Sequence, residues 1–369
     1  MAPWGDKANP VGLPASGRRG LLGLLTALPV LARAGTASAA AALTNTVAAI
    51  PFPEGVSLLV AGPSGGDLSR WADTLQPALE QSLPPDTSIR RVDVGGADGV
   101  TGANQFEARG APDGLTVLLV PGDAVLAWLV GDPRAQFDVG HWVPVMAGVN
   151  SAIVVARQAA GTPNGVIRIG AAGPAGPDLP ALLGLDLLGM RSAPVFGLAD
   201  AGQLQNAFNQ RAVDAVILRG HYMRDQLAAF TAAGGRPLFA LGAHDEAGNT
   251  VRDPAFPDVP LLAEVCAIRS GRPPDGPLYD AWRASAAATQ LDFGLVLPQL
   301  TPAAMVALWR AAGTEAAASL PLQARAIALE ERSLGGPAAT AATAAAAVHA
   351  TALTALRQWL ASRFNWRPA

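Results

Sequence analysis

The stretch of residues 56–73 constrains the fold most, because an apolar run there is followed by a glycine-rich turn and a helical pattern. Residues 56–61 have the length and branched content of a strand buried on both faces. The turn Gly62-Pro63-Ser64-Gly65-Gly66 ends the strand, and helical spacing begins at Leu68, with Ser64 or Asp67 as the expected N-cap. Such a turn leaves backbone N–H groups at a positive helix end, which suits a carboxylate or a phosphate.

Two other interpretations of this turn remain open. Its residues also fit the G-x-S-x-G pattern, in which a strained turn presents a nucleophilic serine, here Ser64, to a histidine. Only one strand precedes the turn, however, and His141, His221, His244 and His349 stand in no recognisable triad context. A purely structural strand-to-helix turn is the other alternative. We prefer the anion site and expect no catalytic residue.

Composition excludes several classes of protein. The 369 residues are half apolar, enough for the cores of two lobes. A net charge of −3 with few charged residues leaves no basic stripe, so we expect neither nucleic acid nor an anionic membrane surface as partner. Cys266 is the single cysteine, and no cysteine or histidine spacing indicates zinc. We expect a buried thiol, no metal and no cofactor.

Residues 1–39 have the pattern of an export signal. The pair Arg18-Arg19 precedes an apolar stretch at residues 21–32, and Ala37-Ser38-Ala39 offers small residues for cleavage. The apolar stretch is too short to span a bilayer stably, although a membrane anchor is the alternative. Two arginines followed after one residue by two leucines also resemble the twin-arginine signature. We predict a soluble periplasmic protein that begins near Ala40.

Two further strands are expected to end at the same edge of the sheet. Residues 87–94 form a short strand before a second glycine-rich turn, and a helix follows to about Arg109. The tight turn Ala111-Pro112-Asp113-Gly114 then leads into the apolar strand at residues 115–120. Asp123 follows at the carboxyl end of this strand, where open parallel sheets bind ligands.

Four segments together resemble a known family. The patterns V-x-x-x-x-P-x-G-G, G-G-A-D-G-V-T-G-A, A-P-D-G-L-T-V-L-L and, later, F-P-D-V-P occur here in the order and spacing of the solute-binding proteins of tripartite tricarboxylate transporters, the Bug family. The similarity covers nearly all of the mature chain, and residues 141–145 occupy the family's approach to the hinge. It implies a two-lobed α/β periplasmic binding protein of type II, with mostly parallel sheets flanked by helices and a small carboxylate in the cleft.

The remaining chain is expected to follow this plan. After the signal at 1–39, residues 40–152 begin lobe 1, residues 153–290 form lobe 2, and residues 291–369 return to lobe 1. Strands in the second lobe are expected at 151–157, 166–170, 194–197, 212–218 and 238–242, and the return strand at 291–298. Residues 301–369 are predicted to be helices packed on lobe 1, with an alanine-rich helix at 338–350.

The resemblance also implies a second binding loop after the strand at 166–170. Ala172, Gly173, Ala175 and Gly176 fall on it, but Ala171, Ala172 and Pro174 replace the family's hydroxyl residues and leave fewer donors. The family's tyrosine-lysine-glycine turn falls on residues 198–200, including Asp200. Its usual acid after the glycine pair falls on Ser69, with Asp67 close by. A cleft-facing Asp67 would favour a ligand that carries a cation, unless it only caps the helix.

Other polar and aromatic residues have more than one interpretation. Arg219, at the end of a strand, either grips a carboxylate or is a solvated loop residue. His244-Asp245-Glu246 are adjacent in sequence and do not converge on one metal ion unless a loop folds around it. The tryptophans are expected to pack in cores, which we predict for Trp71, Trp128, Trp142 and Trp309.

These patterns predict a monomeric extracytoplasmic binding protein. Its ligand would be a small organic acid held by Pro63, Ser64, Gly65, Gly66 and Asp67 of the first turn and by the loop at 171–176, with Ser69, Asp123, Asp200 and Arg219 nearby. The membrane permease of a transporter would receive the ligand. A membrane sensor as the partner, or a hydrolase that uses Ser64, are the alternatives.

Overall fold

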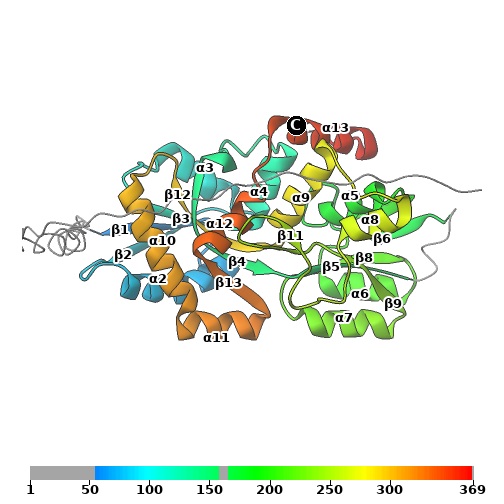
Figure 1. Cartoon of the computed structure of the whole chain (residues 1–369), viewed down its shortest axis with the longest axis horizontal. Coiled ribbons are helices and arrows are strands. Elements are labelled where there is room, and N and C mark those ends of the chain that lie inside the picture. The colour runs from blue at the N-terminus through cyan, green and yellow to red at the C-terminus, as the bar shows by residue number, and fades with distance from the viewer. Residues whose placement is uncertain (1–54, 158–164, 368–369) are drawn as a thin grey trace, which may run out of the picture. The chain divides into compact units, whose positions relative to one another are not determined.

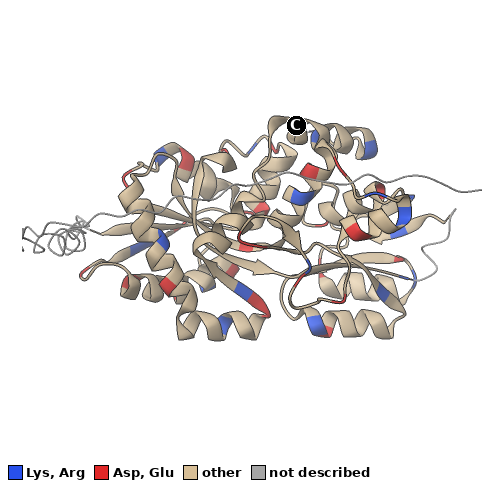
Figure 2. Ribbon diagram, in the orientation of Figure 1, with Lys and Arg blue, Asp and Glu red and all other residues tan. Residues whose placement is uncertain are grey.

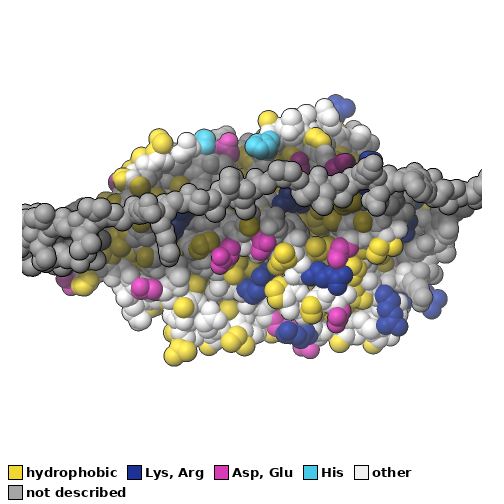
Figure 3. All heavy atoms as spheres, in the orientation of Figure 1, with side chains coloured by type: hydrophobic (Ala, Val, Ile, Leu, Met, Phe, Trp, Pro, Cys, Tyr) yellow, Lys and Arg dark blue, Asp and Glu magenta, His cyan; other side chains and the backbone are white. Residues whose placement is uncertain are grey.

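The computed structural model describes residues 55–157 and 165–367 (Figure 1). The export signal predicted for residues 1–39 lies outside the described residues. Among the helices of the described part, none combines the length and apolar character that a membrane span needs. Basic and acidic side chains are interspersed along these elements (Figure 2). The face drawn in Figure 3 likewise carries charges of both signs among apolar side chains.

A six-stranded sheet joins strands from both ends of the described chain. Its members, in sequence order, are β1 (Val56–Val60), β2 (Ile89–Asp93), β3 (Thr116–Val120), β4 (Trp142–Asn150), β12 (Leu291–Pro298) and β13 (Glu331–Gly335). The spatial order is β13-β4-β12-β3-β1-β2. β1 runs parallel to β2 and β3, whereas β12 is antiparallel to both β3 and β4, and β13 is antiparallel to β4.

A five-stranded sheet contains the middle of the chain. Its members are β5 (Ala152–Arg157), β6 (Ile167–Gly170), β7 (Ser192–Val195), β8 (Ala215–Arg219) and β9 (Gly235–Ala240), in the order β7-β6-β8-β5-β9. β6 is parallel to β7 and β8, and β5 is antiparallel to β8 and β9. A separate hairpin pairs β10 (Ala243–His244) with β11 (Thr250–Val251). Because Ser151 alone separates β4 from β5, the chain passes from one sheet to the other there.

Helices connect and flank these strands (Figure 1). They are α2 (Asp67–Ser82), α3 (Val100–Arg109), α4 (Gly122–Val130), the 3-10 helix η1 (Val139–His141), α5 (Leu179–Leu187), α6 (Ala201–Asn209), α7 (Met223–Ala232), α8 (Leu262–Ser270), α9 (Pro277–Gln290), α10 (Ala303–Ala318), α11 (Leu320–Leu329), α12 (Gly336–Ala344) and α13 (Ala350–Phe364). α10 packs on α2, and α13 packs on α9 and α4. The chain thus returns to its first helix after building the second sheet.

The apolar runs predicted as strands do form buried strands. Within β1, Leu58 and Val60 are fully buried, and β3 and β12 have similarly buried interiors. Trp71 of α2 packs against Phe293 of β12, with 4.9 Å between ring centroids. Trp142 and Trp309 are also buried, and the half-buried Trp128 packs against the same core. The tryptophan predictions are therefore confirmed, and Cys266 is a buried free thiol as expected.

Strand β4 was not predicted. Residues 142–145, expected only as the approach to the hinge, begin this strand, and Pro144 lies at an irregularity in the pairing with β12, where a ladder tolerates it. Two predictions about secondary structure are wrong. Glu331–Gly335 forms β13 inside a stretch predicted to be helical, because it pairs with β4. The alanine-rich helix expected at 338–350 ends at Ala344, and α13 begins only after the extended residue His349.

Candidate functional site

A cavity of about 330 Å³ lies where β1, β3 and β8 end. The turn after β1 contributes Gly62, Pro63 and Gly66, and the turn after β3 contributes Pro121 to Asp123. Arg219 and Gly220 line it from the end of β8. The remaining lining comes from the start of α2, from Ala97, from the end of β4 and from the α9–β12 junction, and includes Trp71, Asn150, Thr289 and Asp292. Carboxyl ends of strands from both sheets therefore meet at one cavity, as is usual for ligand sites in α/β proteins.

A larger cavity of about 980 Å³ lies elsewhere, on α10, α12, α13 and the turn between the last two. About half of its lining residues are alanine or threonine, and Glu246, Asp280, Arg283 and Arg310 also line it. None of its lining residues belongs to a strand of either large sheet, whereas strands of both sheets end at the smaller cavity. We therefore take the smaller cavity as the candidate site.

The glycine turn after β1 uses two of its own N–H groups internally. The Gly66 N–H donates to the Pro63 carbonyl at 3.0 Å, and the Gly65 N–H donates to Ser69 Oγ at 2.9 Å. The prediction that these two groups face a ligand is therefore wrong. The N–H groups without a partner in the described part of the chain belong to the next two residues, Asp67 and Leu68. These are the first two residues of α2, and both line the cavity.

Neither expected N-cap caps α2. Gly66 occupies the N-cap position with extended backbone, and no side chain makes a cap hydrogen bond. Asp67 is the first helical residue, and its exposed carboxylate pairs with Arg70 instead of facing the cavity or capping. Ser69 is buried and accepts hydrogen bonds from Gly65 and Arg91, so its role in the structure is to hold the turn.

Asp123 and Arg219 face the cavity with opposite charges. Asp123 lies in the first turn of α4 and is reached by water through the cavity, while Arg219 ends β8. Within the described residues, neither side chain makes a hydrogen bond or an ion pair within 4.0 Å. Enclosure by protein raises the pKa of Asp123; Arg219 opposes this shift, and Asp98, Asp178 and Asp292 add to it. The fold thus places one unpaired anion and one unpaired cation at a single cavity.

The loop predicted as a second ligand cradle does not line this cavity. The Ala172 N–H donates at 2.6 Å to the carboxylate of Asp178, a buried residue directly before the first residue of α5. Burial raises the pKa of Asp178, against the effects of the Ala172 hydrogen bond and of Arg219. Gly173, Ala175 and Gly176 are absent from the cavity lining, and Asp200 caps α6 by accepting from the Gln203 N–H at 2.8 Å. Ala172 and Asp200 therefore have structural partners already.

Two polar lining residues were missed from the sequence. Asn150 is buried at the end of β4, and its Oδ1 has no hydrogen-bond partner among the described residues. Asp292 accepts a hydrogen bond from Trp71 Nε1 at 2.5 Å. Burial would raise the pKa of Asp292, but His221, Glu331 and Trp71 together outweigh it and the pKa is lowered. Two sequence signals could have revealed them. Asn150 belongs to a polar pair, Asn150-Ser151, between two apolar strands, and Asp292 is a lone acid near the start of an apolar strand.

Ser64 does not have the geometry of a nucleophile elbow. It is exposed, and the residue with left-handed backbone in this turn is Gly65, at φ +76°. The elbow requires strain at the serine itself. No histidine lines the cavity, and no hydrogen bond links Ser64 to a histidine in the described part. The structure gives the hydrolase alternative no support.

No protein-family model and no curated protein matches this chain. Several solved structures do. A TctC solute-binding protein from Polaromonas, solved without ligand, is 17% identical over 85% of this chain and 100% of that chain, with a TM-score of 0.62. MatC from Rhodopseudomonas palustris with bound malate is 17% identical over 84% and 100%, with a TM-score of 0.47. The periplasmic binding protein BugD is 17% identical over 85% and 98%, with a TM-score of 0.43.

The likeness to the Polaromonas protein covers most of this chain and all of that chain. At 17% sequence identity, this likeness establishes a similar fold and nothing about the ligand. The predicted sheets are not mostly parallel: both are mixed, because β12, β13 and β5 pair antiparallel with their neighbours. The rest of the predicted architecture is confirmed: the chain has the two-lobed α/β fold of the TctC solute-binding protein from Polaromonas.

Proposed function

We propose that this chain is an extracytoplasmic solute-binding protein that captures a small organic acid and delivers it to the permease of a tripartite tricarboxylate-type transporter. Support comes from the fold, together with a cavity at the strand ends whose volume of about 330 Å³ suits a small molecule. Delivery to a membrane sensor would use the same closure around ligand and remains the alternative partner. The protein would act as a periplasmic monomer without catalysis.

The proposed lobes follow the membership of the two sheets. Residues 40–152 and 291–369 would form the first lobe, since β1 to β4, β12 and β13 share one sheet. Residues 153–290 would form the second, which contains all but the first residue of β5 and all of β6 to β9. The passage at Ser151 and the α9–β12 junction would be the connections across which the lobes close on ligand.

The observation that carries the proposal is the unpaired couple of Asp123 and Arg219. Arg219 would bind the ligand carboxylate, assisted by the free N–H groups of Asp67 and Leu68 at the positive end of α2. Asp123 would then accept from an amino group on the same ligand. Because Asp123 and Asp292 outnumber Arg219 in the lining, a ligand with only negative charges would be repelled. We therefore propose a zwitterionic organic acid, such as an α-amino acid, as the ligand class.

Titration calorimetry with matched acids tests this function. Aspartate and succinate differ only by an amino group, as do alanine and propionate. We expect at least one amino-bearing acid to bind with one site per chain, and its deaminated partner to bind more weakly. If only deaminated acids bind, the proposed class is wrong, although the protein remains a carboxylate binder. If no small acid binds and a fluorophosphonate probe labels Ser64, the hydrolase alternative replaces the proposal.

A further inference from the structure

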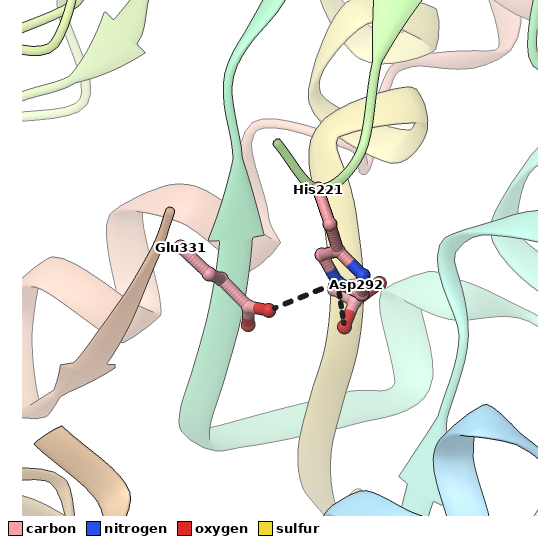
Figure 4. A group of neighbouring side chains, drawn as sticks. All are labelled: His221, Asp292 and Glu331. Atoms are coloured by element: carbon pink, nitrogen blue, oxygen red, sulfur yellow. Dashed lines mark ion pairs between the residues drawn. The ribbon is translucent and has the colours of Figure 1, made fainter. Parts of the chain in front are cut away.

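Three metal-ligating side chains from distant parts of the sequence converge beside the cavity (Figure 4). His221 follows β8 of the five-stranded sheet, Asp292 lies in β12, and Glu331 begins β13 of the six-stranded sheet. One ligand atom from each lies within 4.8 Å of the others. Figure 4 shows the imidazole and both carboxylates pointing toward a common centre. Among the described residues, this is the one such group of histidine, cysteine and acidic side chains.

Glu331 is the residue that the rest of the structure leaves unexplained. Its side chain is fully buried, and among the described residues neither carboxylate oxygen has a hydrogen-bond partner; its one ion pair is the long contact with His221 Nε2 at 3.7 Å. The fold nevertheless makes room for it, because a Cβ at Gly148 would lie 2.0 Å from Glu331 Oε1. His221 Nε2 is likewise buried without a hydrogen bond. Buried carboxylates are normally hydrogen-bonded, paired or bound to a metal.

The spacing of the three groups fits coordination better than hydrogen bonding. His221 Nε2 is 3.6 Å from Asp292 Oδ2 and 3.7 Å from Glu331 Oε2, both beyond the hydrogen-bond range. Two ligands on a tetrahedral ion with bonds of about 2.1 Å stand about 3.4 Å apart, close to these separations. The Trp71 Nε1–H that donates to Asp292 supplies the outer hydrogen bond that commonly orients a metal-binding carboxylate.

The electrostatics of the group also favour an added positive charge. Two carboxylates, those of Asp292 and Glu331, face a single imidazole, that of His221, at 3.6 and 3.7 Å. When both carboxylates are ionised, one imidazolium cannot neutralise them. A divalent cation with a neutral imidazole would balance the two carboxylates.

We propose that His221, Asp292 and Glu331 bind a divalent metal ion of the Zn²⁺ type, with one coordination position left open. Nitrogen and carboxylate oxygen are both ordinary zinc ligands, and three protein ligands with an open position are a common zinc arrangement. The ion would tie the β8–α7 connection of one sheet to β12 and β13 of the other. Since Asp292 also lines the ligand cavity, the ion would offset part of the cavity's negative charge. The proposal stands whether or not the ligand is an organic acid.

Zinc binding by the chain provides the test. The purified protein is stripped with a chelator and titrated with ZnCl₂ by calorimetry, and Co²⁺ then reports tetrahedral coordination through its intense visible absorption. We expect one ion per chain. Glu331→Gln and His221→Gln should each weaken binding by about 100-fold or more, since loss of even an outer-shell partner costs 10–100-fold. The matched control is His141→Gln, which removes the imidazole of an exposed histidine–carboxylate pair with Glu107 and should leave zinc affinity unchanged.

Melting of the metal-free proteins separates this proposal from a plain ion pair. Glu331→Gln removes a fully buried carboxylate that shares one imidazole with Asp292 and has no hydrogen bond among the described residues. Its metal-free form should therefore melt at or above the temperature of the metal-free parent, and zinc should no longer raise it. If His221 is simply a protonated bridge between two carboxylates, Glu331→Gln melts lower and zinc shifts neither protein. That result, or zinc affinity unaffected by both ligand substitutions, would overturn the proposal.

Discussion

Replacing Asp123 by asparagine should reverse the charge preference of the cavity. Asparagine nearly preserves the shape of the side chain and removes its charge. Asp123 makes no hydrogen bond or ion pair within the described residues, so the substitution breaks no such contact in the ligand-free protein. Because enclosure raises the pKa of Asp123, its charge opposes folding at neutral pH, and the asparagine variant should melt slightly higher.

The size of the effect follows from the surroundings of Asp123. Two unit charges about 4 Å apart attract by about 4 kcal/mol at an effective dielectric constant of about 20. Asp123 is reached by water, so desolvation and screening leave a net value nearer that of a charged hydrogen bond, about 1.5–3 kcal/mol. An amino-bearing acid should therefore lose about 10- to 150-fold in affinity. A plain dicarboxylate should gain affinity, since the variant removes a repulsive charge.

Arg219→Gln provides the matched comparison. Both ligand types carry a carboxylate, so this variant should weaken both by a similar factor and leave their ratio unchanged. Calorimetry of the parent and the two variants with aspartate and succinate gives six affinities. The ratio between the ligands should change only when Asp123 is replaced.

Equal losses for both ligands in Asp123→Asn would refute the reasoning. Asp123 would then contribute to the shape or order of the site and not to recognition of an amino group. Unchanged affinity for both ligands in Arg219→Gln would contradict the assignment of Arg219 as the carboxylate-binding group, and with it the choice of cavity.

Three further predictions concern the turn, an inner histidine and the N-terminus. Gly66→Val should abolish ligand binding: a φ of −70° suits valine, but the added Cβ meets Pro63 O at 3.0 Å, so the turn must shift at the cavity wall. Gly65→Ala, at φ +76° in open space, should instead cost about 1–2 kcal/mol of unfolding free energy and retain ligand affinity. Denaturation and calorimetry will measure both variants. Burial is the main cause that lowers the pKa of His244 from 6.5 to about 4. The free energy of unfolding should therefore fall by up to about 3 kcal/mol as the pH drops from 6.5 to about 4. Urea unfolding should show a flatter pH dependence of this free energy in His244→Gln, and an unchanged pH dependence would contradict the assignment. Mass spectrometry of periplasmic protein should find an N-terminus near Ala40, and a full-length chain kept in the cytoplasm would contradict export.

Continuous apolar runs allowed several strands to be predicted from the sequence. β1, β3 and β12 are buried on both faces, and their predicted bounds agree with the structure to within one residue. β13 carried no such signal, because the sequence Glu-Arg-Ser-Leu-Gly has neither an apolar run nor strict alternation. It is a strand because β4 offers it an edge to pair with.

The hydrogen bonds of the two loops predicted to bind a ligand depend on side chains whose positions the sequence pattern does not specify. The glycine-rich turn and the helix after it were predicted correctly, but Ser69 accepts a hydrogen bond from the Gly65 N–H. In the second loop, Asp178 accepts one from the Ala172 N–H. Donors expected to hold a ligand are therefore occupied. The free donors of Asp67 and Leu68 follow from where the helix begins, which the capping prediction placed incorrectly.

The sequence by itself determined the α/β class. It also determined that Asp123 and Arg219 lie at the carboxyl ends of strands, because the end of a buried strand can be located from where an apolar run stops. Only the tertiary structure decided that these two charges share one cavity and that His221, Asp292 and Glu331 meet. The three residues come from different strands or loops of two sheets. Their approach depends on the pairing of β12 and β13 with β4 and on how the β8–α7 connection lies against them, which no local periodicity encodes.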